Sequence, residues 1–269
     1  MIDNFKFKDK YGAYDLVEIM RILRTPEGCP WDREQDHQSI KKNFIEETYE
    51  VVEAINKNDA GLLCEELGDV MMQVVFHAQM ENEKGSFDFD DVCDGVCKKL
   101  IVRHPHVFAD DSAETSDDVL VKWDEIKSKT KNRKTQTSEM NSIPRELPAL
   151  MRAEKVQKKA KKVGFDWSDI SGAFDKVGEE TLELKEAVKG GNADEIFDEL
   201  GDLIFSVVNV ARFVKADPEE ALTHATDKFI GRFEKVENLA KERNIDMKKS
   251  TLDELDKLWD EAKKDAGNQ

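Results

Sequence analysis

Residues 179–202 read EETLELKEAVKGGNADEIFDELGD, with an acidic cluster on each side of Gly190-Gly191-Asn192. This Gly-Gly-Asn segment is typical of a tight turn between two helices. Residues three apart lie on one face of a helix, so each cluster turns its carboxylates in one direction. The stretch therefore predicts two antiparallel helices whose carboxylates meet across one seam. These four carboxylates belong to Glu180, Glu183, Glu199 and Asp202.

The carboxylates predict a metal site. Glu180, Glu183, Glu199 and Asp202 would repel one another in a partly dry seam, and a divalent cation would remove that repulsion. Ligation by oxygen alone favours Mg²⁺, with Mn²⁺ as a possible substitute, over Zn²⁺. The stretch contains no histidine, which disfavours a di-iron centre. The alternative, a solvated acidic surface, fits poorly with apolar neighbours such as Leu200.

The same pattern occurs earlier in the chain, where residues 46–69 read EETYEVVEAINKNDAGLLCEELGD. Without gaps, residues 46–79 and 179–212 are identical at 14 of 34 positions. A repeat of this length indicates a duplicated domain rather than a solenoid unit. The repeat also predicts a possible second set of metal ligands, formed by Glu47, Glu50, Glu66 and Asp69.

Composition limits the classes of function. The chain has 269 residues, of which 39% are hydrophobic and 37% are charged, and this fits two helical domains of ordinary size. A net charge of −17 argues against a nucleic-acid-binding protein. No apolar run reaches the roughly 20 residues of a membrane span, so we expect no membrane partner. The N-terminus lacks an apolar signal core, so a cytoplasmic location is expected.

Apolar residues recur at helical spacing almost throughout, and no convincing strand alternation is present. The predicted fold class is all-α, with two tandem duplicated helical-bundle domains at 1–129 and 149–269. A polar stretch with two prolines predicts a linker at 130–148. A breaker-rich loop is predicted at about 25–32. Helices are predicted at about 14–24, 39–56, 60–83, 89–103, 115–129, 149–162, 171–189, 193–215, 218–243 and 251–264.

Two residue pairs in the second half are candidates for substrate binding. Lys228 and Arg232 lie four residues apart, and so do Trp259 and Lys263. The cations could bind phosphate oxygens that a metal leaves unneutralised, and the indole could pack on a base. The alternatives are surface solvation for the cations and anchoring of a helix for the indole. The first half repeats both spacings, which favours the functional interpretation.

Trp167 and Asn209 are further candidates. Trp167 ends the loop Gly-Phe-Asp-Trp, which could shape a base or ribose pocket or could simply be a packed turn. Asn209 follows Asp202 by about two helical turns and therefore shares its face. The first half has Phe76 at this position. An amide can hydrogen-bond a ribose hydroxyl or a metal-bound water and a phenyl ring cannot, although a satisfied buried amide is the alternative.

The duplication, E-E-x-x-E followed by E-x-x-D, the motif Pro30-Trp31-Asp32 and the sequence RHPHVF at 103–108 resemble the MazG family of nucleoside triphosphate pyrophosphohydrolases. The resemblance covers nearly the whole chain, and the acidic motif is shared with the wider all-α pyrophosphatase superfamily. It implies Mg²⁺-dependent hydrolysis of NTPs and dNTPs to the nucleoside monophosphate and pyrophosphate, with broad base tolerance. It also implies a homodimer.

With this resemblance, the catalytic group is expected to be Glu179, Glu180, Glu183, Glu199, Asp202 and Lys228. Substrate is expected to contact Lys228, Arg232, Trp259, Lys263, Asn209 and Trp167. The second half is expected to be the catalytic one, although the first half keeps its carboxylates. The alternatives are a narrower pyrophosphatase for dUTP or modified nucleotides, and a non-enzymatic helical scaffold or regulatory partner.

Overall fold

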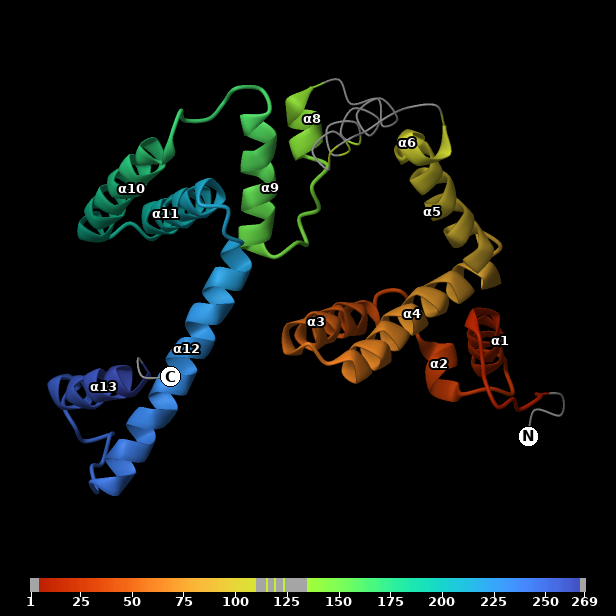
Figure 1. Cartoon of the computed structure of the whole chain (residues 1–269), viewed down its shortest axis with the longest axis horizontal. Helices are drawn as coiled ribbons and strands as arrows, with labels where there is room; N and C mark the ends of the chain where they lie inside the picture. The colour runs from red at the N-terminus through yellow and green to blue at the C-terminus, as the bar shows by residue number, and fades with distance from the viewer. Residues whose placement is uncertain (1–4, 110–114, 116–118, 120–122, 124–134, 267–269) are drawn as a thin grey trace. The chain divides into compact units, whose positions relative to one another are not determined.

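The computed structural model describes residues 5–109, 115, 119, 123 and 135–266 (Figure 1). The described residues form helices joined by turns and contain no strand, which confirms the all-α prediction. The chain divides into two units, Met1–Lys131 and Asn132–Gln269. None of the described helices combines the length and the apolar character that crossing a membrane requires.

The first unit contains six described helices. Its core consists of Met20, Ile40, Val75, Phe76 and Met80. The helices are α1 (Ala13–Leu23), α2 (Pro30–Glu34), α3 (Lys41–Lys57), α4 (Ala60–Glu83), α5 (Phe89–Arg103) and α6 (Pro105–Phe108). The long helix α4 contacts α3, α1 and α5, so it forms the centre of this unit (Figure 1).

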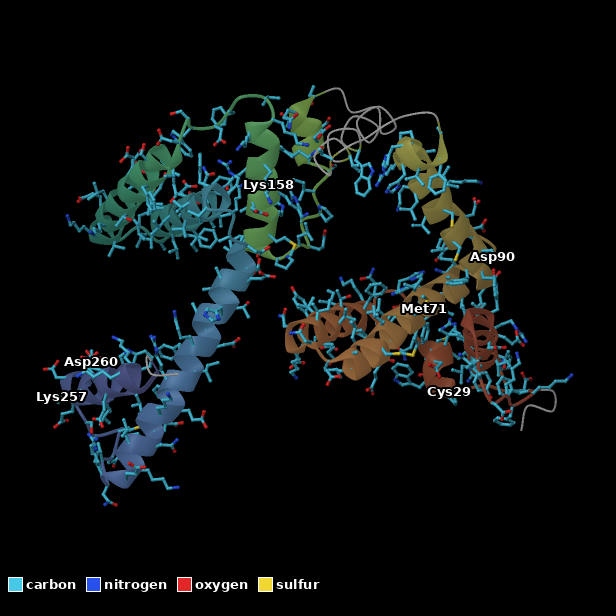
Figure 2. The ribbon with its side chains drawn as sticks, in the orientation of Figure 1. Cys29, Met71, Asp90, Lys158, Lys257 and Asp260 are labelled. Atoms are coloured by element: carbon cyan, nitrogen blue, oxygen red, sulfur yellow. The ribbon has the colours of Figure 1, made fainter. Side chains whose placement is uncertain are left out.

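The second unit repeats the antiparallel helix pair. Its helices are α8 (Gln136–Met140), α9 (Ala149–Lys161), α10 (Ile170–Gly190), α11 (Ala193–Phe213), α12 (Pro218–Glu242) and α13 (Leu252–Ala266). α9 packs on α11 and on α8, and α13 folds back against the later part of α12 (Figure 1). A separate apolar cluster joins α12 to α13. Exposed polar side chains such as Lys257 and Asp260 cover the outside of α13 (Figure 2).

The turns between the paired helices form as the sequence predicts. Gly191 ends α10 with φ 74°, a left-handed conformation that glycine adopts without steric cost, and Asn58 ends α3 with φ 52°. The next residue then caps the second helix. The Asn192 side chain accepts a hydrogen bond from the backbone N–H of Asp194, and Asp59 accepts from those of Gly61 and Leu62.

Some predicted boundaries differ from the structure. α2 lies partly within the expected loop, because a proline fits the first turn of a helix. α5 ends before Pro105 as predicted, but the short helix α6 follows at once. The helix expected at 115–129 lies outside the described residues except for 115, 119 and 123.

Residues 135–148 also differ from the expected linker. They contain α8, which is capped by the Thr135 side chain and packs against α9. Glu139 of α8 pairs with Lys159 of α9 at 2.6 Å, and Ile143 is buried. This part of the chain is therefore packed into the second unit, and it supplies one wall of the cavity described below.

Candidate active site

The helix pair α10–α11 brings together all five predicted carboxylates of the second unit. Oxygens of Glu179, Glu180 and Glu183 lie within 4.8 Å of one another, and so do those of Glu180, Glu199 and Asp202. Both triplets include Glu180. The two sets are thus one cluster centred on this residue, as the helical spacing predicts.

Glu180 has the surroundings expected of a metal ligand. Its residue is only 3% exposed, and its Oε2 has no hydrogen-bond partner among the described residues. A buried carboxylate oxygen without a partner is costly, so the position favours an added cation. The neighbouring donors are carboxylate oxygens, which suit Mg²⁺ or Mn²⁺.

Lys176 is a member of the cluster that the sequence interpretation missed. Its Nζ lies 2.5 Å from Glu180 Oε1 and 2.8 Å from Glu179 Oε1. Hydrogen bonds to Glu179 and Glu180 raise the pKa of Lys176 above its ordinary value, so the ammonium stays charged. The signal was present in the sequence, because Lys176 precedes Glu179 by three residues and Glu180 by four.

Glu183 is repelled by two neighbouring carboxylates of the cluster. Burial, followed by the charges of Glu180 and Glu199, raises the pKa of Glu183, and Lys176 opposes this only in part. The charge of Lys176 is thus too small to offset both desolvation and the neighbouring carboxylates at Glu183. An added cation would favour the ionised form of Glu183.

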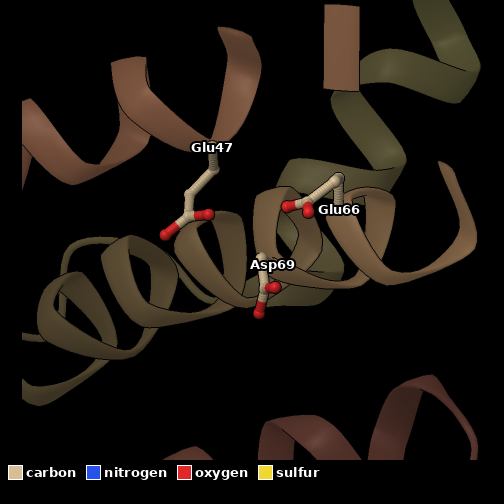
Figure 3. A group of neighbouring side chains, drawn as sticks. All are labelled: Glu47, Glu66 and Asp69. Carbon is tan, nitrogen blue, oxygen red and sulfur yellow. The ribbon is translucent and has the colours of Figure 1, made fainter. Parts of the chain in front are cut away.

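The first unit holds a similar but less compensated cluster. Oxygens of Glu47, Glu66 and Asp69 lie within 4.8 Å of one another, and Glu47 comes from α3 whereas Glu66 and Asp69 come from α4 (Figure 3). Burial and nearby carboxylates, including Glu50, raise the pKa of Glu47 and of Glu66. No lysine or arginine of the described residues pairs with this triplet.

The predicted substrate-binding residues form two groups, one on α12 and α13 and one around a cavity. Lys228, Arg232, Trp259 and Lys263 lie on α12 and α13, whereas the carboxylates lie on α10 and α11. α12 meets α9 and α11 only near its start and then extends away from them (Figure 1). Within one chain, the structure does not bring these four residues to the carboxylates.

The side chains on α12 and α13 have different surroundings. Trp259 packs against Phe229, with ring centroids 5.0 Å apart, and joins the apolar cluster between the two helices, as the anchoring alternative expects. Lys228 is exposed, Lys263 pairs with Asp260 at 3.3 Å, and the buried Nε of Arg232 has no partner among the described residues.

Trp167 and Asn209, in contrast, line one cavity. It has a volume of about 540 Å³ and is bounded by α8, α9, α11 and the loop 164–167. Asn209 is 8% exposed, and its Oδ1 accepts a hydrogen bond from Arg212 Nε at 2.8 Å. Trp167 lies against Gly172, where a Cβ would approach its indole to 2.2 Å, so only glycine allows this packing.

An ion pair joins the loop 164–167, which forms one wall of the cavity, to α11. The Arg212 guanidinium donates two hydrogen bonds to the Asp166 carboxylate, one of them 2.9 Å long. The Arg212 and Asp166 side chains are only 5% and 12% exposed. Arg212 holds the pKa of Asp166 below its ordinary value, with a smaller contribution from Lys161. Arg212 was not predicted as part of the site, whereas Asp166 belongs to the loop Gly-Phe-Asp-Trp that could shape a pocket or a packed turn.

These features define an all-α protein with a duplicated acidic helix pair and a candidate metal centre made of oxygen ligands. The second helix pair also borders a cavity that apolar and amide side chains line. The family model of the MazG nucleotide pyrophosphohydrolase domain matches residues 35–108 and 173–237, which include both acidic pairs. The chain belongs to the MazG family.

Similar proteins agree with this assignment. The chain is 45% identical over 252 residues to the nucleoside triphosphate pyrophosphohydrolase of Escherichia coli K12, covering 93% of this chain and 96% of that protein. It is 45% identical over 249 residues to the nucleoside triphosphate pyrophosphohydrolase/pyrophosphatase MazG of Thermotoga maritima, covering 93% and 94%. It is also 48% identical over 246 residues to the uncharacterized protein YabN of Bacillus subtilis, covering 91% of this chain and 50% of YabN.

Proposed function

We propose that the protein is a Mg²⁺-dependent nucleoside triphosphate pyrophosphohydrolase that converts NTPs and dNTPs to the nucleoside monophosphate and pyrophosphate. The observation that carries the proposal is the carboxylate cluster around Glu180, a buried residue with a partnerless oxygen. Relatives that carry this activity in their names support the choice of reaction. The expected location of the protein is the cytoplasm.

Glu180, Glu183, Glu199 and Asp202 would hold the metal. When bound, Mg²⁺ would neutralise phosphate oxygens and lower the pKa of a coordinated water. Glu179, an exposed member of the cluster, would accept the proton of the attacking water. Attack at the α-phosphorus breaks its bond to the α–β bridging oxygen, and pyrophosphate leaves. The Lys176 ammonium, which pairs with Glu179 and Glu180, would donate hydrogen bonds to phosphate oxygens.

The first prediction concerns the products. A single turnover with ATP and Mg²⁺ is expected to release pyrophosphate and AMP in equal amounts, because the proposed attack is at the α-phosphorus. Separation of the labelled products by anion exchange measures this. ADP with orthophosphate would contradict the proposed reaction. Repeating the assay with all common NTPs, dNTPs and dUTP tests the narrower alternative, which requires one preferred base.

The second prediction concerns assembly as a homodimer. The acidic helix pair exposes large apolar side chains, among them Phe197 at 77% and Leu182 at 62%. Such surfaces normally mark an interface. Sedimentation at micromolar concentration is therefore expected to give twice the chain mass of 30.7 kDa.

A charged substitution tests which surface forms this interface. Phe197→Asp is expected to shift the equilibrium towards the single chain, because it would bury a carboxylate in the interface. Phe7→Asp is the matched control, since Phe7 is 88% exposed but lies outside the helices. A wild-type protein that sediments at the single-chain mass would refute the dimer.

A further inference from the structure

A side chain that lines the cavity of the second unit carries a buried hydrogen-bond acceptor without a partner in the described part of the chain. Gln157 of α9 lines the cavity and is 6% exposed. Its Nε2 donates a hydrogen bond to the backbone carbonyl oxygen of Phe205 at 2.8 Å. This contact fixes the orientation of the Gln157 amide, because only the amide nitrogen can donate to a carbonyl oxygen. Gln157 Oε1 is buried and has no partner among the described residues.

Asn209 supplies the complementary group. Its Oδ1 faces the guanidinium of Arg212, which can only donate, so the Asn209 amide nitrogen must point elsewhere. No hydrogen bond from this nitrogen is present among the described residues. Within the described ranges, the residues that line the cavity thus carry an unpartnered acceptor on α9 and an unpartnered donor on α11. Aromatic rings also line it, including Trp167, which is 42% exposed.

The cavity lies at a suitable distance from the carboxylates. Asp202, Phe205 and Asn209 follow one another at helical spacing on one stripe of α11. Seven residues of helix separate Asp202 from Asn209, which is about 10 Å along the axis. A ribose and its first phosphate can bridge this separation.

The corresponding place in the first unit is filled by side chains. There α1 packs on α4, as α9 packs on α11. The Arg24 guanidinium lies over the ring of Phe76, 5.3 Å from its centroid, and Phe76 is itself 4% exposed in the core. The two units therefore differ at this place as well as in their carboxylate clusters.

We propose that this cavity binds the base of the substrate and that Gln157 Oε1 accepts a hydrogen bond from a base N–H group. The inference rests on the proposed function and locates the base of the nucleotide substrate in this cavity. Adenine, cytosine, guanine and uracil each carry at least one N–H group, so an acceptor of this kind is compatible with several bases. It selects against a base that has none.

The test compares ATP with purine riboside triphosphate, which keeps the purine ring but has no N–H on it. Wild-type protein is expected to prefer ATP by about tenfold in kcat/KM, because the analogue leaves Gln157 Oε1 without a partner. In Gln157→Met the ratio is expected to fall close to one. Loss of the Nε2 hydrogen bond to Phe205 affects both substrates, so it cancels in this ratio.

Gln79→Met is the matched control. Gln79 is also buried and also donates through Nε2, to Glu83 at 3.0 Å, but it lies in the first unit. This variant is expected to keep the tenfold preference. A preference that is absent in the wild type, or that survives unchanged in Gln157→Met, would overturn the base pocket.

A cavity-filling variant gives a second test if Gln157→Met fails to fold. Ala160 lines the cavity, and Ala160→Phe would occupy part of it. We expect kcat/KM for ATP to fall at least tenfold, mainly through KM, with Mn²⁺ binding to the carboxylates unchanged. Wild-type kinetics in a folded Ala160→Phe protein would overturn the inference. Pyrophosphate release without any response to these variants refutes the base pocket alone, whereas no release from any nucleotide refutes the proposed function as well.

Discussion

Glu180→Ala is expected to lower kcat by a factor of about 10²–10³, the usual effect of losing one well-placed group that stabilises the transition state. Glu180 is the residue common to both carboxylate triplets, and its side chain is 5% exposed. Its loss removes a ligand from the centre of the cluster and leaves the Lys176 ammonium with Glu179 alone. Steady-state kinetics with ATP and Mg²⁺ measure the effect, and titration with Mn²⁺ should show weaker metal binding.

Glu47→Ala is the matched control in the first unit. Glu47 occupies the equivalent position, and its cluster also brings three carboxylates within 4.8 Å. We expect this variant to keep a large part of the activity, because the first unit has Phe76 where the second has Asn209. Helicity and oligomeric state must be unchanged in both variants. Equal inactivity of the two would show that the units share one site or that both catalyse.

Asp166→Asn is expected to reduce the free energy of unfolding of the second unit by about 3–5 kcal/mol, the range for removing one partner of a buried ion pair. The reason is that the Arg212 guanidinium, 5% exposed, would remain buried without its counter-charge. Urea denaturation followed by fluorescence measures the change. Glu261→Gln breaks the half-exposed pair with Arg243 and should cost less than about 1 kcal/mol. Similar costs for the two variants would contradict the structural role of Asp166.

The same ion pair predicts how stability depends on pH. Arg212 holds the pKa of Asp166 below the ordinary value of 3.8, so the folded state favours the ionised carboxylate. The stabilisation is therefore present above pH 3.8 and is lost as the pH falls through the lower pKa of the folded state. The difference in unfolding free energy between wild type and Asp166→Asn should shrink below this pH. A difference that grows on acidification would contradict the assigned direction.

Local patterns in the sequence were sufficient for the helix pairs and the carboxylate clusters. Helical spacing places Glu180 and Glu183 on one face, and Gly191 and Asn192 turn the chain and cap the next helix. These effects act over a few residues, so they can be read before the fold is known. The duplication then indicated two units, because the same local pattern occurs twice. The short helix α8 was missed because its packing on α9, rather than its own periodicity, stabilises it.

The cavity and its polar groups depend on contacts between segments distant in the sequence. Arg212 meets Asp166 across 46 residues, and Gln157 meets Phe205 across 48. No periodicity encodes such pairs, since they depend on how α9, α11 and the loop 164–167 pack. The same holds for Trp259, whose contact with Phe229 follows from the packing of α13 on α12. Sequence periodicity thus determines which side chains share a helix face, whereas helix packing determines which faces meet and which groups remain without a partner.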